Sequence, residues 1–131
     1  MRGGPQDERI LGMDKPEIEF PGGDAPTELV IRDIVVGDGA EAVPGAKVEV
    51  HYVGVDFATG EEFDSSWNRG ESIEFPLRGL IQGWQDGIPG MRVGGRRELI
   101  IPPELAYGPA GGGHQLSGRT LIFVIDLLGV G

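Results

Sequence analysis

The chain has 131 residues, 39% of them hydrophobic, which is enough for one small domain with a single core. Its 11 basic and 21 acidic side chains give a net charge of -10, which argues against nucleic acid because phosphates would be repelled. Without cysteine, the chain has no disulfides or thiolate chemistry, and no apolar run is long enough to cross a bilayer. We therefore expect a soluble, cytoplasmic monomer that binds neither nucleic acid nor membranes.

Residues 1–27 are rich in glycine, proline and acidic residues, which predicts an extended or loosely docked N-terminal extension. The first 12 residues lack the apolar run of a secretory signal, and Met13 is a candidate native start. We interpret residues 1–12 as an alternative start or an added leader. The folded domain is expected to cover residues 28–131.

Alternating apolar residues predict a series of short strands along this domain. In chain order, the expected strands cover 29–36, 47–57, 61–65, 73–77, 97–101 and 119–128. Thr59-Gly60 makes a hairpin turn between the second and third, and Pro76 places the fourth at a sheet edge. The glycine-rich segment 108–118 is expected to be a long, flexible loop.

A helical period replaces the alternation between Leu80 and Met91. The apolar stripe consists of Ile81, Trp84, Ile88 and Met91. Two glycines weaken this helix and Pro89 limits it. One short α-helix and about five strands with hairpin-length links predict an α+β fold, in which an antiparallel β-sheet buries one face against the helix.

Side chains for covalent or metal chemistry are few. The two histidines, His51 in a strand and His114 in the loop, have no spacing typical of a triad or a zinc site, so a metal or acid–base pair is the weaker alternative. Gly111, Gly112 and Gly113 lack the strand and helix context of a phosphate loop. We predict no cofactor and no metal.

Aromatic residues are the unusual feature, because they occur in nearly every expected element. Phe75 and Phe123 are interpreted as ordinary core residues. Trp84 lies on the inner stripe of a helix weakened by glycines, where a large ring can form the floor of a pocket.

Five segments, read in order, carry a resemblance to a known family. They are VHYVG (50–54), GEEFDSSWNRG (60–70), LIQGWQDGIPGM (80–91), VGGRRELIIPPELAYG (93–108) and TLIFVIDLL (120–128). Over about residues 29–129 the chain resembles the FKBP-type peptidyl-prolyl cis/trans isomerases, in a single-domain, bacterial-like minimal form. The resemblance implies a bent antiparallel sheet wrapped around one short helix.

The resemblance also implies a set of pocket residues. It gives catalytic roles to Tyr52, Phe63, Asp64, Trp84, Tyr107 and Phe123, and substrate-binding roles to Arg69, Ile73, Leu80 and Ile81. In this family pattern Trp84 is the floor, and Tyr52, Phe63 and Phe123 are walls. Ile81 offers a backbone N–H and Tyr107 a hydroxyl to ligand carbonyls. Asp64 is held by Tyr52 and Arg69.

The chain departs from the family pattern at the pocket rim. The segment between Phe75 and Trp84 is two residues shorter than is common, which predicts a reshaped start of the helix around Leu80. In the loop, residues 114–118 replace an Ile-Pro-Pro segment, and Leu116 is the candidate for the missing apolar contact. Ile73 stands where many members have an aromatic residue.

The resulting hypothesis is an isomerase that accelerates rotation of X-Pro bonds in peptides and folding proteins. The implied partners are proline-containing peptides, unfolded protein clients and the inhibitors tacrolimus and rapamycin. The first alternative is a proline-peptide binding or chaperone module with little turnover. The second is a plain interaction domain whose aromatic residues are all core.

Overall fold

The computed structural model describes residues 14–18 and 22–131, so the expected leader, residues 1–12, lies outside the described residues. The strands are β1 Val30–Val35, β2 Lys47–Asp56, β3 Glu62–Ser65, β4 Ile73–Pro76, β5 Arg96–Ile101 and β6 Leu121–Val130. The α-helices are α1 Ser66–Arg69 and α2 Gln82–Gly87, with short 3-10 turns at Leu77–Gly79 and Pro103–Leu105.

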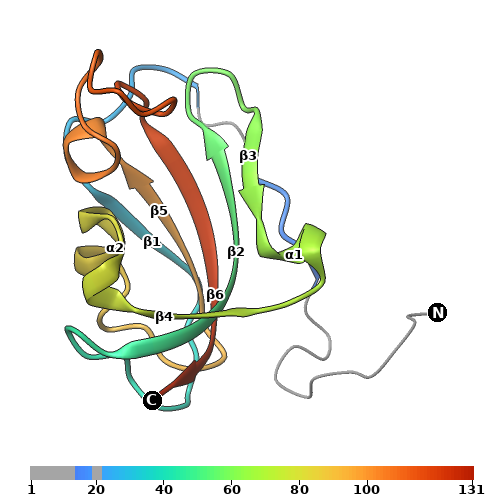
Figure 1. Cartoon of the computed structure of the whole chain (residues 1–131). Coiled ribbons are helices and arrows are strands. Elements are labelled where there is room, and N and C mark those ends of the chain that lie inside the picture. The colour runs from blue at the N-terminus through green and yellow to red at the C-terminus, as the bar shows by residue number, and fades with distance from the viewer. Residues whose placement is uncertain (1–13, 19–21) are drawn as a thin grey trace.

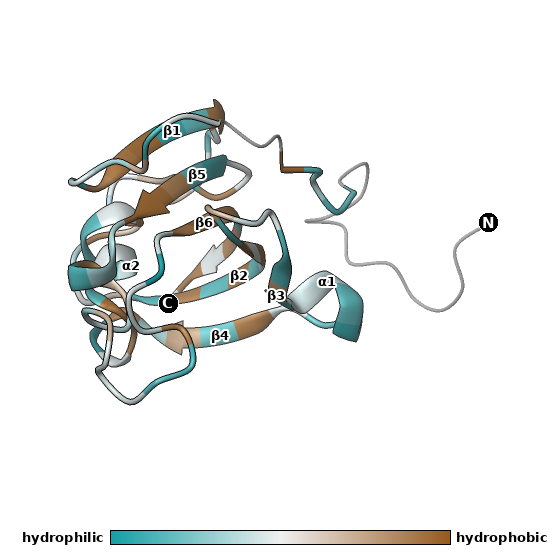
Figure 2. Cartoon of the chain, turned by 90° about the horizontal axis from the view of Figure 1, so that it is seen from above, coloured by the Kyte–Doolittle hydropathy of each residue, from teal (hydrophilic) through white to brown (hydrophobic). Residues whose placement is uncertain are grey.

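The six strands form one antiparallel sheet in the order β1-β5-β6-β2-β3, and β4 pairs with β2 beside this path. The sheet curves, and α1 and α2 lie at opposite sides of the molecule (Figure 1, Figure 2). The predicted α+β class is confirmed, and the six strands lie at the six ranges that the alternation predicted, so the sheet has one strand more than the rounded figure of about five. The four-residue helix α1 was not predicted.

Two short strands share the same edge of β2. The N-terminal part of β2, from Lys47 to Val50, pairs with β4. The C-terminal part, from Val53 to Val55, pairs with β3. The two positions between these ladders therefore have no strand partner on this edge, and one of them is Tyr52.

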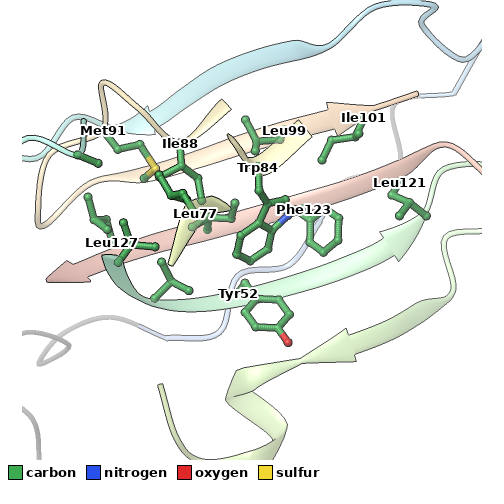
Figure 3. Packing of buried hydrophobic residues seen from close by; sticks show 14 residues of the cluster. Tyr52, Leu77, Trp84, Ile88, Met91, Leu99, Ile101, Leu121, Phe123 and Leu127 are labelled. Atoms are coloured by element: carbon green, nitrogen blue, oxygen red, sulfur yellow. The ribbon is translucent and has the colours of Figure 1, made fainter. Parts of the chain in front are cut away.

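The sheet buries side chains on both faces. From β6, Leu121, Phe123, Ile125 and Leu127 join a core cluster with Trp84 and Ile88 of the α2 segment. Figure 3 shows Trp84 and Phe123 side by side in it. On the other face, Ile122 packs with Val55, and Ile18 from the N-terminal extension lies against them. All of Leu121–Leu128 is buried. The sequence predicted a sheet that buries one face against the helix, whereas the structure also has a smaller buried cluster on the other face.

The described part of the N-terminal extension is attached to the sheet by polar contacts as well. The backbone oxygen of Asp14 accepts a hydrogen bond from Arg96 at 2.8 Å. The ammonium of Lys15 forms an ion pair with Glu62 at 2.6 Å. None of the helices among the described residues has the length and apolar character needed to span a membrane.

The helix α2 is shorter than its apolar period predicted. Leu80 and Ile81 have extended backbones, and Pro89 follows closely after the helix. Its two glycines allow α2 to lie close to β5. A Cβ atom on Gly83 would come within 2.5 Å of the Ile101 side chain, and one on Gly87 within 2.7 Å of Leu99.

This contact predicts an unusual effect of a helical glycine. Gly87→Ala should lower the free energy of unfolding by about 1–3 kcal/mol because the new methyl group meets a buried side chain. In an exposed helix the same change would stabilise by up to ~1 kcal/mol. Urea unfolding followed by circular dichroism measures the difference. Gly79→Ala is the matched control, because its Cβ would lie 3.8 Å from the nearest atom, and it should change stability by less than about 0.5 kcal/mol. A stabilising Gly87→Ala would contradict the close packing.

Candidate functional site

A cavity of about 260 Å³ opens between α2 and the sheet. Its lining is mostly aromatic and aliphatic, with one carboxylate. The lining residues are Tyr52, Asp64, Phe75, Leu80, Ile81, Trp84, Tyr107 and Phe123. They come from β2, β3, β4, α2 with the segment before it, β6, and the loop after β5. The cavity thus depends on the whole fold being assembled.

The indole of Trp84 lies at the centre of the aromatic residues. Tyr52, Phe75 and Phe123 each meet it edge-on, with ring centroids 5.3, 5.9 and 5.2 Å away. Edge-to-face contacts of this kind fix the orientation of each ring. Trp84 is only 4% exposed, and its indole N–H has no hydrogen-bond partner among the described residues. Trp84 therefore forms an apolar floor with one unused donor.

Among the described residues, Asp64 is the only charged group that lines the cavity, and two donors hold it. The Tyr52 hydroxyl donates to one oxygen of Asp64 at 2.6 Å, and Arg69 donates to the other at 2.7 Å. A second nitrogen of Arg69 donates to the Tyr52 hydroxyl at 3.0 Å. The three side chains therefore form a closed triangle at the rim.

The triangle also sets the protonation of its members. Partial burial would raise the pKa of the Asp64 carboxyl, but the hydrogen bonds from Tyr52 and Arg69 outweigh it and leave that pKa below its ordinary value. Burial and then the hydrogen bond to Asp64 raise the pKa of the Tyr52 phenol. At neutral pH the rim therefore carries an ionised carboxylate beside a neutral phenol.

The glycine-rich segment 108–118, expected to be a long, flexible loop, contains a series of hydrogen-bonded turns. The two ends of the loop are joined by a hydrogen bond, in which the backbone N–H of Gly118 donates to the backbone oxygen of Gly108 at 2.7 Å. The ring of His114 stacks on Tyr107 with centroids 4.1 Å apart. Nδ1 of His114 accepts a hydrogen bond from the N–H of Leu116. The loop therefore places Tyr107 against the cavity through local contacts.

Comparison with known proteins fits this geometry. The family model for FKBP-type peptidyl-prolyl cis-trans isomerases matches residues 39–128. The chain belongs to this family. A Corynebacterium glutamicum protein named "Probable FK506-binding protein" is 72% identical over 116 residues, which cover 88% of this chain and 98% of the relative. The FK506-binding protein of Streptomyces anulatus is 57% identical and covers 92% of this chain and 100% of its own length.

The solved structures agree with the family assignment. The crystal structure of FkpA from Escherichia coli matches with a TM-score of 0.72 at 36% identity. That match covers 93% of this chain and 55% of the FkpA chain. The resemblance inferred from the five sequence segments is thus confirmed, and the chain is an FKBP-type peptidyl-prolyl isomerase.

Most of the residues that the family resemblance implied come together in the structure. Seven of them line the cavity: Tyr52, Asp64, Leu80, Ile81, Trp84, Tyr107 and Phe123. Arg69 reaches it through Asp64. Phe63, Ile73 and Leu116 pack against the adjoining core cluster and do not line the cavity. Phe63 meets Phe123 edge-on at 5.5 Å and so supports that ring.

Two contributors were missed by sequence reasoning. Phe75, interpreted as plain core, lines the cavity, and it lies two residues after Ile73 on the same face of β4. His114, interpreted as an ordinary loop residue, supports Tyr107 by stacking. The alternation of β4 shows that Phe75 points inward but does not tell a cavity-lining ring from a core ring, and nothing in the sequence pattern indicated the stack of His114 on Tyr107. In the described part of the chain, no group of three or more histidine or acidic residues is arranged to hold a metal ion.

The rim triangle yields a test of function against stability. Asp64→Ala should lower kcat/KM about tenfold, equivalent to about 1.4 kcal/mol, because the phenol and guanidinium lose the group that orients them. The free energy of unfolding should fall by less than about 1 kcal/mol, since the ion pair is partly exposed.

Glu41→Ala is the matched control, because Glu41 pairs with Arg92 at similar exposure and lies outside the cavity. It should leave kcat/KM unchanged. If Asp64→Ala loses stability but keeps full kcat/KM, the carboxylate only supports the fold.

Proposed function

We propose that the cavity receives the proline ring of an X-Pro segment and accelerates its cis/trans isomerisation in peptides and folding proteins. The arrangement around Trp84 supports this proposal most directly. An apolar floor with three edge-on rings offers a slot for a small saturated ring. The ordered polar triangle at the rim offers fixed charges and donors for the flanking amides.

Such a site suits a reaction that makes and breaks no bond. Rotation about an amide has a barrier of roughly 18–20 kcal/mol because resonance in the planar group is lost at the transition state. The planar amide is the more charge-separated form, so an apolar slot disfavours it relative to the twisted form. Oriented donors hold the flanking carbonyls while the bond turns. No nucleophile, cofactor or metal is needed for this step.

The proposed roles follow the positions in the cavity. Trp84 supports the proline ring from below, and Tyr52 and Phe123 form its walls, with Phe63 behind Phe123. The backbone N–H of Ile81 and the hydroxyl of Tyr107 donate to substrate carbonyls. Leu80, Ile73 and Leu116 complete the apolar surroundings, and Arg69 keeps Asp64 ionised and fixed.

We further propose that tacrolimus and rapamycin bind at the same site. Two relatives carry the name FK506-binding protein. The cavity is slightly smaller than typical ligand pockets of ~300–1,000 Å³. Only part of a macrolide would therefore enter it, and the remainder would lie across the rim.

The cellular setting is likewise a proposal. We propose that residues 28–131 are the isomerase domain and that it works in the cytoplasm as a monomer. Its clients would be proline-containing, unfolded proteins, on which it acts as a folding helper. The net charge of -10 keeps copies of the chain apart by repulsion and is compatible with a monomer.

A protease-coupled assay tests the catalytic proposal. The protease cleaves a reporter peptide only when its X-Pro bond is trans, and the uncatalysed conversion takes tens to hundreds of seconds. Micromolar protein should accelerate conversion at least about tenfold, and tacrolimus or rapamycin should abolish the effect. If the protein binds the inhibitor tightly but the reporter peptide converts no faster than without protein, the cavity belongs to a binding or chaperone module with little turnover. If the protein neither accelerates the conversion nor binds tacrolimus or rapamycin, it is a plain interaction domain.

Tryptophan fluorescence tests where the ligand binds. In a Trp67→Phe background, Trp84 is the only tryptophan, and its emission should change when tacrolimus or a proline peptide covers the floor. The reciprocal Trp84→Phe variant keeps Trp67 in α1 and should show a much smaller response. A response that follows Trp67 instead would place the ligand outside the cavity.

A further inference from the structure

The position of Tyr52 in the sheet raises a question about its backbone. β4 pairs with β2 as far as Val50, and β3 pairs with β2 from Val53 onwards. Tyr52 lies in the gap between the two ladders, and it is only 5% exposed. Buried backbone N–H and C=O groups need partners, because leaving them unsatisfied is costly. On this edge no strand supplies them.

The hydroxyl of Ser66 takes the place of the missing strand. The N–H of Tyr52 donates to Oγ of Ser66 at 2.7 Å, and the same hydroxyl donates to the backbone oxygen of Tyr52 at 3.2 Å. Ser66 is fully buried, with 0% exposure. A single side chain therefore satisfies both backbone groups of Tyr52, as an antiparallel neighbour would.

His51 completes this contact. Its Nδ1 lies 2.9 Å from Oγ of Ser66. The hydroxyl proton points to the Tyr52 oxygen, so the tautomer with hydrogen on Nδ1 lets His51 donate to Ser66 and satisfies all three contacts at once. The His51 ring also stacks on Trp67, with centroids 4.1 Å apart and planes 16° apart. His51 and the backbone of Tyr52 therefore hold the Ser66 hydroxyl in place at the start of α1.

Ser66 also belongs to the corner that carries the rim triangle. It is the first residue of α1, two residues after Asp64 and three before Arg69. Tyr52 is therefore attached to this corner at both of its ends, by its backbone to Ser66 and by its phenol to Asp64. Two attachments on this edge define where the ring lies and how it faces Trp84, because the ladder with β6 holds β2 only along its other edge.

We propose that Ser66 is a positioning residue for the isomerase site: its buried hydroxyl, supported by His51, fixes Tyr52 against the β3–α1 corner. Ser66 does not touch the cavity and acts through Tyr52. The effect on catalysis rests on the proposed function of the cavity, but the effect on the Tyr52 phenol does not.

The test uses the phenol itself as a probe. The chain has two tyrosines, so a Tyr107→Phe background leaves Tyr52 alone. Labelling with 3-fluorotyrosine, whose phenol titrates at lower pH, lets ¹⁹F NMR follow its ionisation while the protein stays folded. With Ser66 present, the midpoint should lie above that of free 3-fluorotyrosine, because burial and Asp64 both disfavour the phenolate. In Ser66→Ala the midpoint should move toward the free value.

The matched control is the neighbouring serine. Ser65 caps α1 through a hydrogen bond from the N–H of Asn68, and no hydrogen bond of its side chain to Tyr52 is present. Ser65→Ala should weaken the helix corner yet leave the fluorophenol midpoint unchanged. With Tyr107 retained, Ser66→Ala should lower kcat/KM about 5- to 30-fold, and Ser65→Ala by less than about twofold.

All variants are measured at temperatures where urea unfolding shows that they are folded. A loss of stability alone then changes neither the fluorophenol midpoint nor kcat/KM. If Ser66→Ala does not fold, Ser66→Cys fills the same space with a weaker donor and acceptor and carries the same expectations. Equal effects of the Ser65 and Ser66 variants, or an unchanged phenol midpoint in the Ser66 variant, would overturn the proposal. A parent protein without isomerase activity would refute the proposed function, and the phenol titration would still decide the role of Ser66.

Discussion

The close contact between α2 and β5 is the constraint on which the site depends. Because Gly83 and Gly87 have no side chains, the helix lies directly against Ile101 and Leu99. This contact fixes the height of the helix above the sheet and with it the position of Trp84. The indole then meets the rings of β2, β4 and β6 edge-on, which leaves a cavity above it. A helix held farther away would change the depth of the cavity and the ring contacts together. The glycines that weaken α2 as a helix are therefore needed for its packing.

A second constraint is electrostatic. A carboxylate beside an apolar cavity loses hydration, and burial alone would push the Asp64 carboxyl toward its neutral form. The donors Tyr52, from β2, and Arg69, from α1, prevent this. The charge is consequently fixed in position before any ligand arrives, and no reorganisation is needed when a substrate amide twists. The apolar floor and the polar rim are thus separate in composition but share Tyr52, whose ring faces Trp84 and whose hydroxyl faces Asp64.

The sequence predicted the parts of this arrangement that follow from periodicity. Alternation located the strands, and the change of period located α2. The family resemblance placed Tyr52, Trp84 and Phe123 in one pocket, and in the structure these three residues line one cavity. Periodicity does not distinguish a ring that fills the core from one that lines a cavity, because both point inward, and Phe75 was missed for that reason. The helix α1 has four residues, too few to show a period. The bond between Ser66 and Tyr52 spans 14 residues and depends on where two ladders end, which no local pattern records.

The base and the rim of the cavity differ in what holds them. The base is built from long strands and α2, so its geometry is tied to the core of the protein. The rim is built from local structures: the turn at Leu77–Gly79, the start of α2, and the loop in which His114 stacks on Tyr107. These are also the places where the family resemblance predicts departures from the common pattern. A change there would alter the surroundings of the cavity mouth without disturbing the floor. Under the proposed function, the base therefore sets the reaction, and the short turn before α2 and the loop around Leu116 set which residues flanking proline are accepted.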